Sequence, residues 1–136
     1  MENKIFLNCL TLIAIMLISI LGFPQESSKN IWPHFRGINC SGVAHPDQKP
    51  PVDLESAEKI IWKTPIISGA SSPCIWGDKI ILTGFDKEKQ QLQVINYNRI
   101  NGKLLWKRIV PAKEIETYHR VGNPADATPV TDGERI

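Results

Sequence analysis

Few residues in this 136-residue chain are of types that do chemistry, and they are widely spaced. The candidates are the three histidines, two of the three cysteines and three of the six aspartates: His34, His45, His119, Cys40, Cys74, Asp78, Asp86 and Asp132. Metal sites usually draw ligands from short, regular spacings, and the histidines show none. Each aspartate adjoins a glycine or lies in a run of charged residues, which is typical of turns. The sequence therefore predicts no catalytic set and no metal site.

One stretch of polar and aromatic residues offers candidates for contacting a ligand. His119 lies between Tyr118 and Arg120 in a segment without apolar periodicity. Loops of this kind often carry binding, although a solvated loop is the alternative. His34 follows Trp-Pro, where packing or a backbone hydrogen bond is the expected role. We therefore single out residues 118 to 120 as candidate loop contacts.

The N-terminal residues are typical of a targeting segment. Lys4 precedes an apolar run at residues 5 to 21, which Gly22 and Pro24 end. We interpret residues 1 to 25 as a secretory signal peptide. An uncleaved anchor is the alternative, because the run is long for a signal and short for a membrane span. A secreted or periplasmic protein is expected, with membrane contact only through an uncleaved segment.

The charge of the chain bears on which class of partner it can bind. The 16 lysines and arginines nearly balance 14 aspartates and glutamates and are scattered along the chain, so no nucleic-acid partner is expected.

Two cysteines, Cys40 and Cys74, remain after signal removal. They can pair in an oxidising compartment, or one can be a buried apolar residue and the other a loop thiol.

Two pairs of segments repeat. Residues 72 to 80 align without a gap on residues 128 to 136, with the proline, glycine and isoleucine identical. Residues 60 to 63 reappear at 104 to 107 as two aliphatic residues followed by Trp-Lys. A period of about 40 to 55 residues indicates stacked units that bury their apolar faces together. When such units consist of strands, the pattern predicts a β-propeller.

Turn signals divide residues 73 to 110 into four predicted strands. Gly77-Asp78 is a two-residue hairpin signal, residues 86 to 89 are charged, and residues 98 to 102 turn the chain again. We expect an all-β protein in which this stretch forms a four-stranded antiparallel meander. That is the form of one propeller blade.

The spacing of the repeats predicts an insertion. Trp62 and Trp106 are 44 residues apart, whereas Ser72 and Thr128 are 56 apart, so 12 extra residues lie between the copies. We interpret them as a loop between blades that contains the candidate contacts at 118 to 120.

The domain organisation expected is a lead-in followed by part of a propeller. Residues 26 to 58 lack periodic pattern and are predicted to be irregular, and residues 59 to 136 to form a partial propeller. A ring needs about four to eight blades. The second copy stops at Ile136, so we expect an incomplete gene product that ends inside a strand. Alone it is expected to fold poorly or to oligomerise, and a sharp two-state melt of a monomer would count against this.

Residues 96 to 106 resemble the repeat of the pyrroloquinoline-quinone (PQQ)-type propeller family. That repeat typically reads Ala-x-Asp-x-x-Thr-Gly-x-x-x-Trp, and here Gly102 and Trp106 keep their identity and spacing. Asparagine replaces the alanine, the aspartate and the threonine, at Asn96, Asn98 and Asn101.

The resemblance assigns structural roles to the repeat residues. Asn98 and Asn101 can make the turn-closing side-chain bonds, and Gly102 supplies a positive φ. Trp106 offers a flat surface for docking on the neighbouring blade, and Trp62 would do so one blade earlier.

A second segment is similar to one subgroup of the family. Residues 32 to 37, followed by Gly-Val-Ala at 42 to 44, resemble the opening of a secreted bacterial subgroup in which Trp-Pro-x-Phe-Arg-Gly follows the signal peptide. The resemblance extends over residues 31 to 136 and implies an incomplete PQQ-type propeller.

Three classes of function stay open. The first is a binding or scaffold propeller whose loops take a protein or small-molecule ligand. The second is a PQQ-dependent alcohol or sugar dehydrogenase, whose catalytic set would lie beyond Ile136. The third is an interaction part of a larger secreted protein. We expect the first, with no catalytic, cofactor-binding or metal residue in this chain; PQQ with Ca²⁺ is implied by the resemblance alone.

Overall fold

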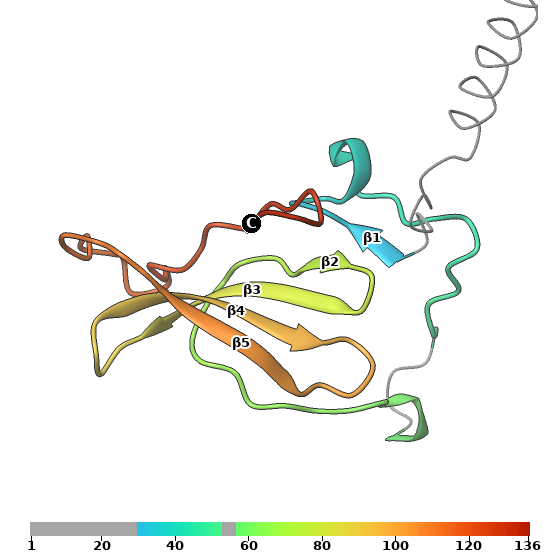
Figure 1. Cartoon of the computed structure of the whole chain (residues 1–136), viewed down its shortest axis with the longest axis horizontal. Helices are drawn as coiled ribbons and strands as arrows, with labels where there is room; N and C mark the ends of the chain where they lie inside the picture. Colours follow the sequence, from blue (N-terminus) through green and yellow to red (C-terminus); the bar gives the residue numbers. More distant parts are fainter. Residues whose placement is uncertain (1–29, 53–56) are drawn as a thin grey trace, which may run out of the picture.

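The computed structural model describes residues 30 to 52 and 57 to 136 (Figure 1). The signal peptide or anchor predicted for residues 1 to 25 lies outside the described residues. Within the described part, no helix has both the length and the apolar character needed to cross a membrane.

A single antiparallel sheet forms the centre of the described structure. Its strands follow one another in chain order: β1 (Ile31–Trp32), β2 (Cys74–Trp76), β3 (Lys79–Asp86), β4 (Gln91–Asn98) and β5 (Leu104–Val110). The other regular elements described are two 3-10 turns, Ile38–Cys40 and Ala57–Lys59. The prediction of an all-β chain is confirmed.

Strands β2 to β5 form the predicted four-stranded meander (Figure 1). Gly77, with φ of 57°, opens the hairpin in which Trp76 pairs with Lys79. The charged turn then returns the chain so that Asp86 pairs with Gln91. Local turn chemistry is sufficient to set this topology, because each connection is only a few residues long.

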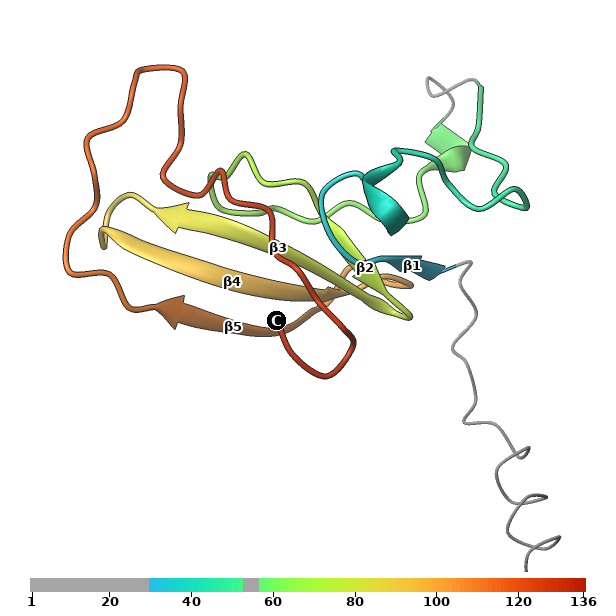
Figure 2. The ribbon, with the colours of Figure 1, turned by 90° about the horizontal axis from the view of Figure 1, so that it is seen from above.

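One face of the sheet packs against the C-terminal part of the chain. Its buried side chains include Cys74, Ile81, Phe85 and Asn96. The segment that covers it runs from residue 118 to 136 and crosses the strands (Figure 2). We call this surface the C-terminal face; its burial supplies most of the core among the described residues.

The opposite face is covered by residues that precede β2. A Cβ placed on Gly84 would lie 2.5 Å from Ile67 Cγ1 and 3.2 Å from Ile95 Cδ1, so these side chains meet closely there. The amide of Phe85 donates to the carbonyl of Ser68 at 2.7 Å, which extends the pairing of β3 beyond the end of β2. The chain is thus folded over both faces of the sheet.

Two predicted strands are wrong. Residues 60 to 63, predicted to end a strand, and residues 128 to 136, predicted to open one, form no strand. A strand needs a neighbour that takes up a run of its backbone hydrogen bonds. Among the described residues, the Thr131 amide donates to the Pro33 carbonyl at 2.9 Å, but this single bond does not make a strand of residues 128 to 136. The lead-in also differs from prediction, since it contributes the short strand β1, which pairs with β2.

Candidate functional site

Three tryptophan rings lie directly against glycines. A Cβ placed on any of these glycines would lie 2.5 Å from a ring atom, far inside van der Waals contact. The pairs are Trp32 with Gly37, Trp62 with Gly102, and Trp76 with Gly133. Each glycine also has a positive φ, which disfavours any side chain. Glycine is therefore needed at these positions for two independent reasons: the positive φ and the lack of space for a Cβ beneath the ring.

The contact between Trp62 and Gly102 joins distant parts of the chain. The indole Nε1–H of Trp62 donates to the carbonyl oxygen of Arg99 at 2.7 Å. The ring covers Gly102, whose amide donates to the carbonyl of Asn98 at 2.8 Å. The ring thus binds the β4–β5 turn through both stacking and a hydrogen bond.

Two asparagine side chains close the same turn. Asn98 Oδ1 accepts hydrogen bonds from the amides of Ile100 (2.9 Å) and Asn101 (3.1 Å). Asn101 Oδ1 accepts from the amide of Lys103 at 3.0 Å. Trp106 lies half-buried on β5 and pairs with Asn96. The turn-closing bonds that the repeat pattern implies are therefore present.

The candidate contacts at 118 to 120 do not form one cluster. The ring of Tyr118 meets that of Phe85 edge to face, with centroids 6.1 Å apart. The exposed His119 accepts at Nδ1 from the amide of Val121 at 3.4 Å, and Arg120 is exposed. Tyr118 therefore helps to anchor the loop to the sheet, while its two neighbours lie at the surface.

A hollow of about 400 Å³ lies beneath this loop. Tyr118 lines it together with Glu114, Glu116 and Asn123, while His119 and Arg120 do not. Sequence reasoning did not single out the two glutamates. All of residues 114 to 118 line the hollow, so the signal that could have found the glutamates is their place in the predicted loop just before Tyr118.

A second hollow, of about 450 Å³, lies between the lead-in and the sheet. Its walls include Trp32, Ile38, Val43 and Ile75, and Arg99 contributes to its lining. This volume lies within the usual range of small-molecule pockets. Sequence reasoning missed it, because the lead-in has no periodic pattern that would place its apolar side chains.

Both cysteines of the described residues, Cys40 and Cys74, are free thiols. Cys74 is fully buried, and its Sγ donates to the carbonyl oxygen of Pro129 at 2.6 Å. Burial raises the pKa of the Cys74 thiol to about 11. Cys40 is exposed. The structure therefore has the second of the two arrangements considered: Cys74 is a buried residue, Cys40 is a loop thiol, and they form no disulfide.

We predict a large difference in thiol reactivity. Alkylation at pH 8 is expected to label Cys40 at least about 100-fold faster than Cys74, because the thiolate is the nucleophile and Cys74 is buried with a raised pKa. Mass spectrometry of the labelled peptides measures both rates in one sample. Equal rates, or a disulfide-linked peptide pair, would contradict this arrangement.

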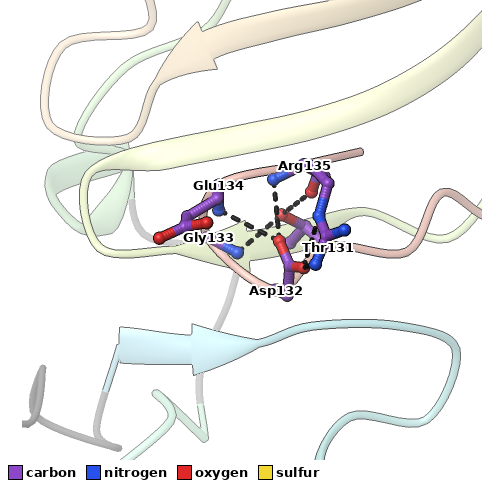
Figure 3. Close-up of polar contacts among 5 residues, drawn as sticks. All are labelled: Thr131, Asp132, Gly133, Glu134 and Arg135. Carbon is purple, nitrogen blue, oxygen red and sulfur yellow. Dashed lines mark hydrogen bonds and ion pairs between the residues drawn. The ribbon is translucent and has the colours of Figure 1, made fainter.

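The aspartates serve turns. Asp132 Oδ1 accepts from the amides of Glu134 and Arg135, and Oδ2 accepts from the Arg135 guanidinium at 2.8 Å (Figure 3). The backbone bond from Arg135, followed by its side-chain bond, lowers the pKa of Asp132. Asp86 has a lowered pKa for the same reason, through Lys89. These carboxylates favour the charged form and are engaged by their own turns.

Asp78 and His34 also have local partners. Asp78 Oδ1 accepts from the Arg99 guanidinium at 3.3 Å. His34 Nδ1 lies 3.0 Å from the carbonyl oxygen of Phe35, a backbone contact of the expected kind. No group of three His, Cys, Asp or Glu side chains placed to hold a metal ion occurs in residues 30 to 52 and 57 to 136.

The fold and the site define an all-β protein in which three of the four tryptophans dock on positive-φ glycines and the loop and the lead-in line two hollows. No family model, curated protein or solved structure matches the chain.

Proposed function

We propose that this chain is part of a secreted or periplasmic PQQ-type β-propeller that acts as a binding or scaffold module. The meander of β2 to β5 is its blade. Residues 60 to 63 belong to the preceding blade, and residues 128 to 136 open the next one.

The contact between Trp62 and Gly102 carries the proposal. These residues occupy the tryptophan and glycine positions of two successive repeat copies, 40 residues apart. The ring lies on the glycine and its Nε1–H reaches the carbonyl of Arg99 in the same turn. A repeat protein needs such a contact, because each unit buries its apolar surface only against its neighbours.

A second contact between repeat copies supports the same view. Ser72 and Thr128 are equivalent positions of the two copies, and the amide of Ser72 donates to Thr128 Oγ1 at 3.1 Å. Close by, the Sγ of Cys74 donates to the carbonyl of Pro129, which aligns with Pro73. In a propeller, neighbouring blades pack face to face. Equivalent segments of successive repeat copies would therefore lie side by side, as these two do.

The binding role is supported by the two hollows and the loop that covers one of them. Ligands of propellers and other repeat proteins usually contact loops on one face, and the hollow under residues 114 to 124 is formed by such a loop. A protein or small-molecule ligand would bind there.

The quinone and calcium of the family's dehydrogenases do not fit the described residues. Calcium takes six to eight oxygen ligands, mostly from carboxylates and carbonyls. Asp78, Asp86 and Asp132 are separated along the sheet and each is bonded within or beside its own turn. The proposal therefore assigns no role to the quinone.

An oxidation assay separates the scaffold from a dehydrogenase. The protein is incubated with PQQ and Ca²⁺, and reduction of an artificial electron-acceptor dye is followed with alcohols and sugars as substrates. We expect no rate above that of free PQQ. Turnover that needs protein, quinone and substrate together would overturn the scaffold function.

The propeller itself has a separate test. If the reading frame continues beyond Ile136, we expect further Gly-x-x-x-Trp copies at intervals of about 40 to 55 residues. A continuation without such copies would contradict the propeller.

A further inference from the structure

Strand β5 is an exposed edge of the sheet. It is last in the strand order and has seven residues, none of them proline (Figure 1). Among the described residues, its regular pairing is with β4 alone. Every second residue of an edge strand directs its N–H and C=O outward, which makes the edge a template for another strand.

The side chains of β5 are exposed and largely apolar. Leu104 is 52% exposed, Leu105 48%, Ile109 59% and Val110 39%. An edge that combines free backbone groups with exposed aliphatic side chains is suited to strand addition.

The strand and the residues that flank it are basic, with Lys107 and Arg108 in β5 itself. Residues 103 to 113 contain four basic residues and no acidic one: Lys103, Lys107, Arg108 and Lys113. In the described part of the chain, none of these four forms an ion pair. Lys107 and Arg108 also line a hollow of about 640 Å³ beside the strand, together with Gln93 and Ile109.

The positive charge of β5 favours another protein over a second copy of this chain as the molecule that binds the edge. If two β5 strands paired antiparallel about their centres, Lys107 of one copy would face Lys107 or Arg108 of the other, depending on the register. Like charges directly opposite one another destabilise a strand pair. An acidic partner has the opposite effect, so the edge discriminates against copies of itself by repulsion.

We propose that the β5 edge binds an extended segment of a partner protein that carries two consecutive acidic residues between apolar or β-branched residues. Lys107 and Arg108 are consecutive and therefore point to opposite faces of the sheet. Two consecutive acidic residues on an added strand also point to opposite faces, so each lies across from one cation. The flanking residues then meet the aliphatic side chains of β5. This inference rests on the proposed binding function and names the partner's chemistry.

The probe is a capped, fluorescent peptide, Thr-Val-Thr-Glu-Glu-Val-Thr-Val, titrated into the protein and followed by fluorescence anisotropy. A peptide with Lys-Lys in place of Glu-Glu is the matched control and is expected to bind at least about tenfold more weakly. In the double variant K107E/R108E the preference should reverse, so that the Lys-Lys peptide binds better. A reversal cannot result from misfolding, and circular dichroism checks that the sheet is retained.

Two further peptides distinguish strand addition from charge attraction. Each is N-methylated at alternate residues, one peptide in each of the two alternate sets. We expect one of them to lose at least about tenfold in affinity and the other to bind nearly as the parent does, because only one edge of the added strand donates to β5. Equal binding of both methylated peptides would overturn strand addition.

Other results also overturn the proposal. Equal binding of the Glu-Glu and Lys-Lys peptides, or no binding of either, would contradict it, as would concentration-dependent dimers of the protein that K107E/R108E abolishes. If the peptide experiments overturn strand addition, the proposed scaffold function is still supported as long as the dye assay shows no turnover. Turnover in that assay overturns the scaffold function whatever the peptides do.

Discussion

Replacing Gly102 by alanine is expected to lower the free energy of unfolding by about 2 to 4 kcal/mol. The backbone at Gly102 has φ of 69°, which costs an L-residue about 1 kcal/mol or more. The new Cβ would also lie 2.5 Å from Cε3 of Trp62, so the ring must move from the turn. Urea unfolding followed by circular dichroism measures the change.

Gly122 provides the matched control. Its backbone is not in the positive-φ region, and a Cβ there would meet its nearest neighbour, the His119 carbonyl oxygen, at 3.4 Å. We expect Gly122→Ala to change the stability by no more than about 0.5 kcal/mol.

A double variant isolates the ring contact. In a Trp62→Ala background the clash is absent, so Gly102→Ala should cost only the backbone term, about 1 kcal/mol. If the cost of Gly102→Ala is the same in both backgrounds, Trp62 does not dock on Gly102.

Asn96→Leu is expected to stabilise the protein by about 1 to 2 kcal/mol. Asn96 is 1% exposed, and its Oδ1 is buried without a hydrogen-bond partner among the described residues. A buried acceptor that makes no bond has lost its hydration without compensation. Leucine has the same branched heavy-atom shape and removes this cost, which the denaturation midpoint would report.

Asn98, two residues further along β4, provides the contrast, because replacing it by leucine should lower the stability rather than raise it. Asn98 Oδ1 accepts two amide hydrogen bonds, so Asn98→Leu is expected to destabilise by about 1 to 2 kcal/mol. If Asn96→Leu also destabilised, an ordered water or another donor would have to satisfy Asn96 Oδ1.

The meander could be predicted from sequence because its information is local. Gly77 and the charged turn after Asp86 specify two of its connections, and Asn98, Asn101 and Gly102 specify the third. Each signal acts over a few residues, where side-chain hydrogen bonds and positive φ decide the turn.

The strands predicted at residues 60 to 63 and 128 to 136 show the limit of local information. The first was predicted from its apolar sequence and its repeat at 104 to 107, and the second from its alignment with residues 72 to 80, yet neither forms a strand. Sequence pattern reports which side chains suit a strand, whereas pairing requires a backbone neighbour that only the assembled fold supplies. The tryptophan of the first segment docks on its glycine without that pairing.

The candidate site was predictable in part. Repeat spacing predicted a loop around residues 118 to 120, and residues 111 to 127 form no strand. Its three singled-out residues separate, with Tyr118 against Phe85 and the other two at the surface. The glutamates of the hollow and the apolar walls beneath the lead-in depend on contacts between segments far apart in the chain.

The sequence by itself determined the turns and the order of strands β2 to β5, whereas which tryptophan ring lies on which glycine was decided by the tertiary structure. Only the tertiary structure decided that Cys74 is buried against Pro129 rather than paired with Cys40. It also decided that Asn96 Oδ1 is buried without a partner and that β5 is left as a basic edge. The physical reason is distance along the chain. Turn chemistry acts between near neighbours, whereas burial and strand pairing join residues that the sequence separates by tens of positions.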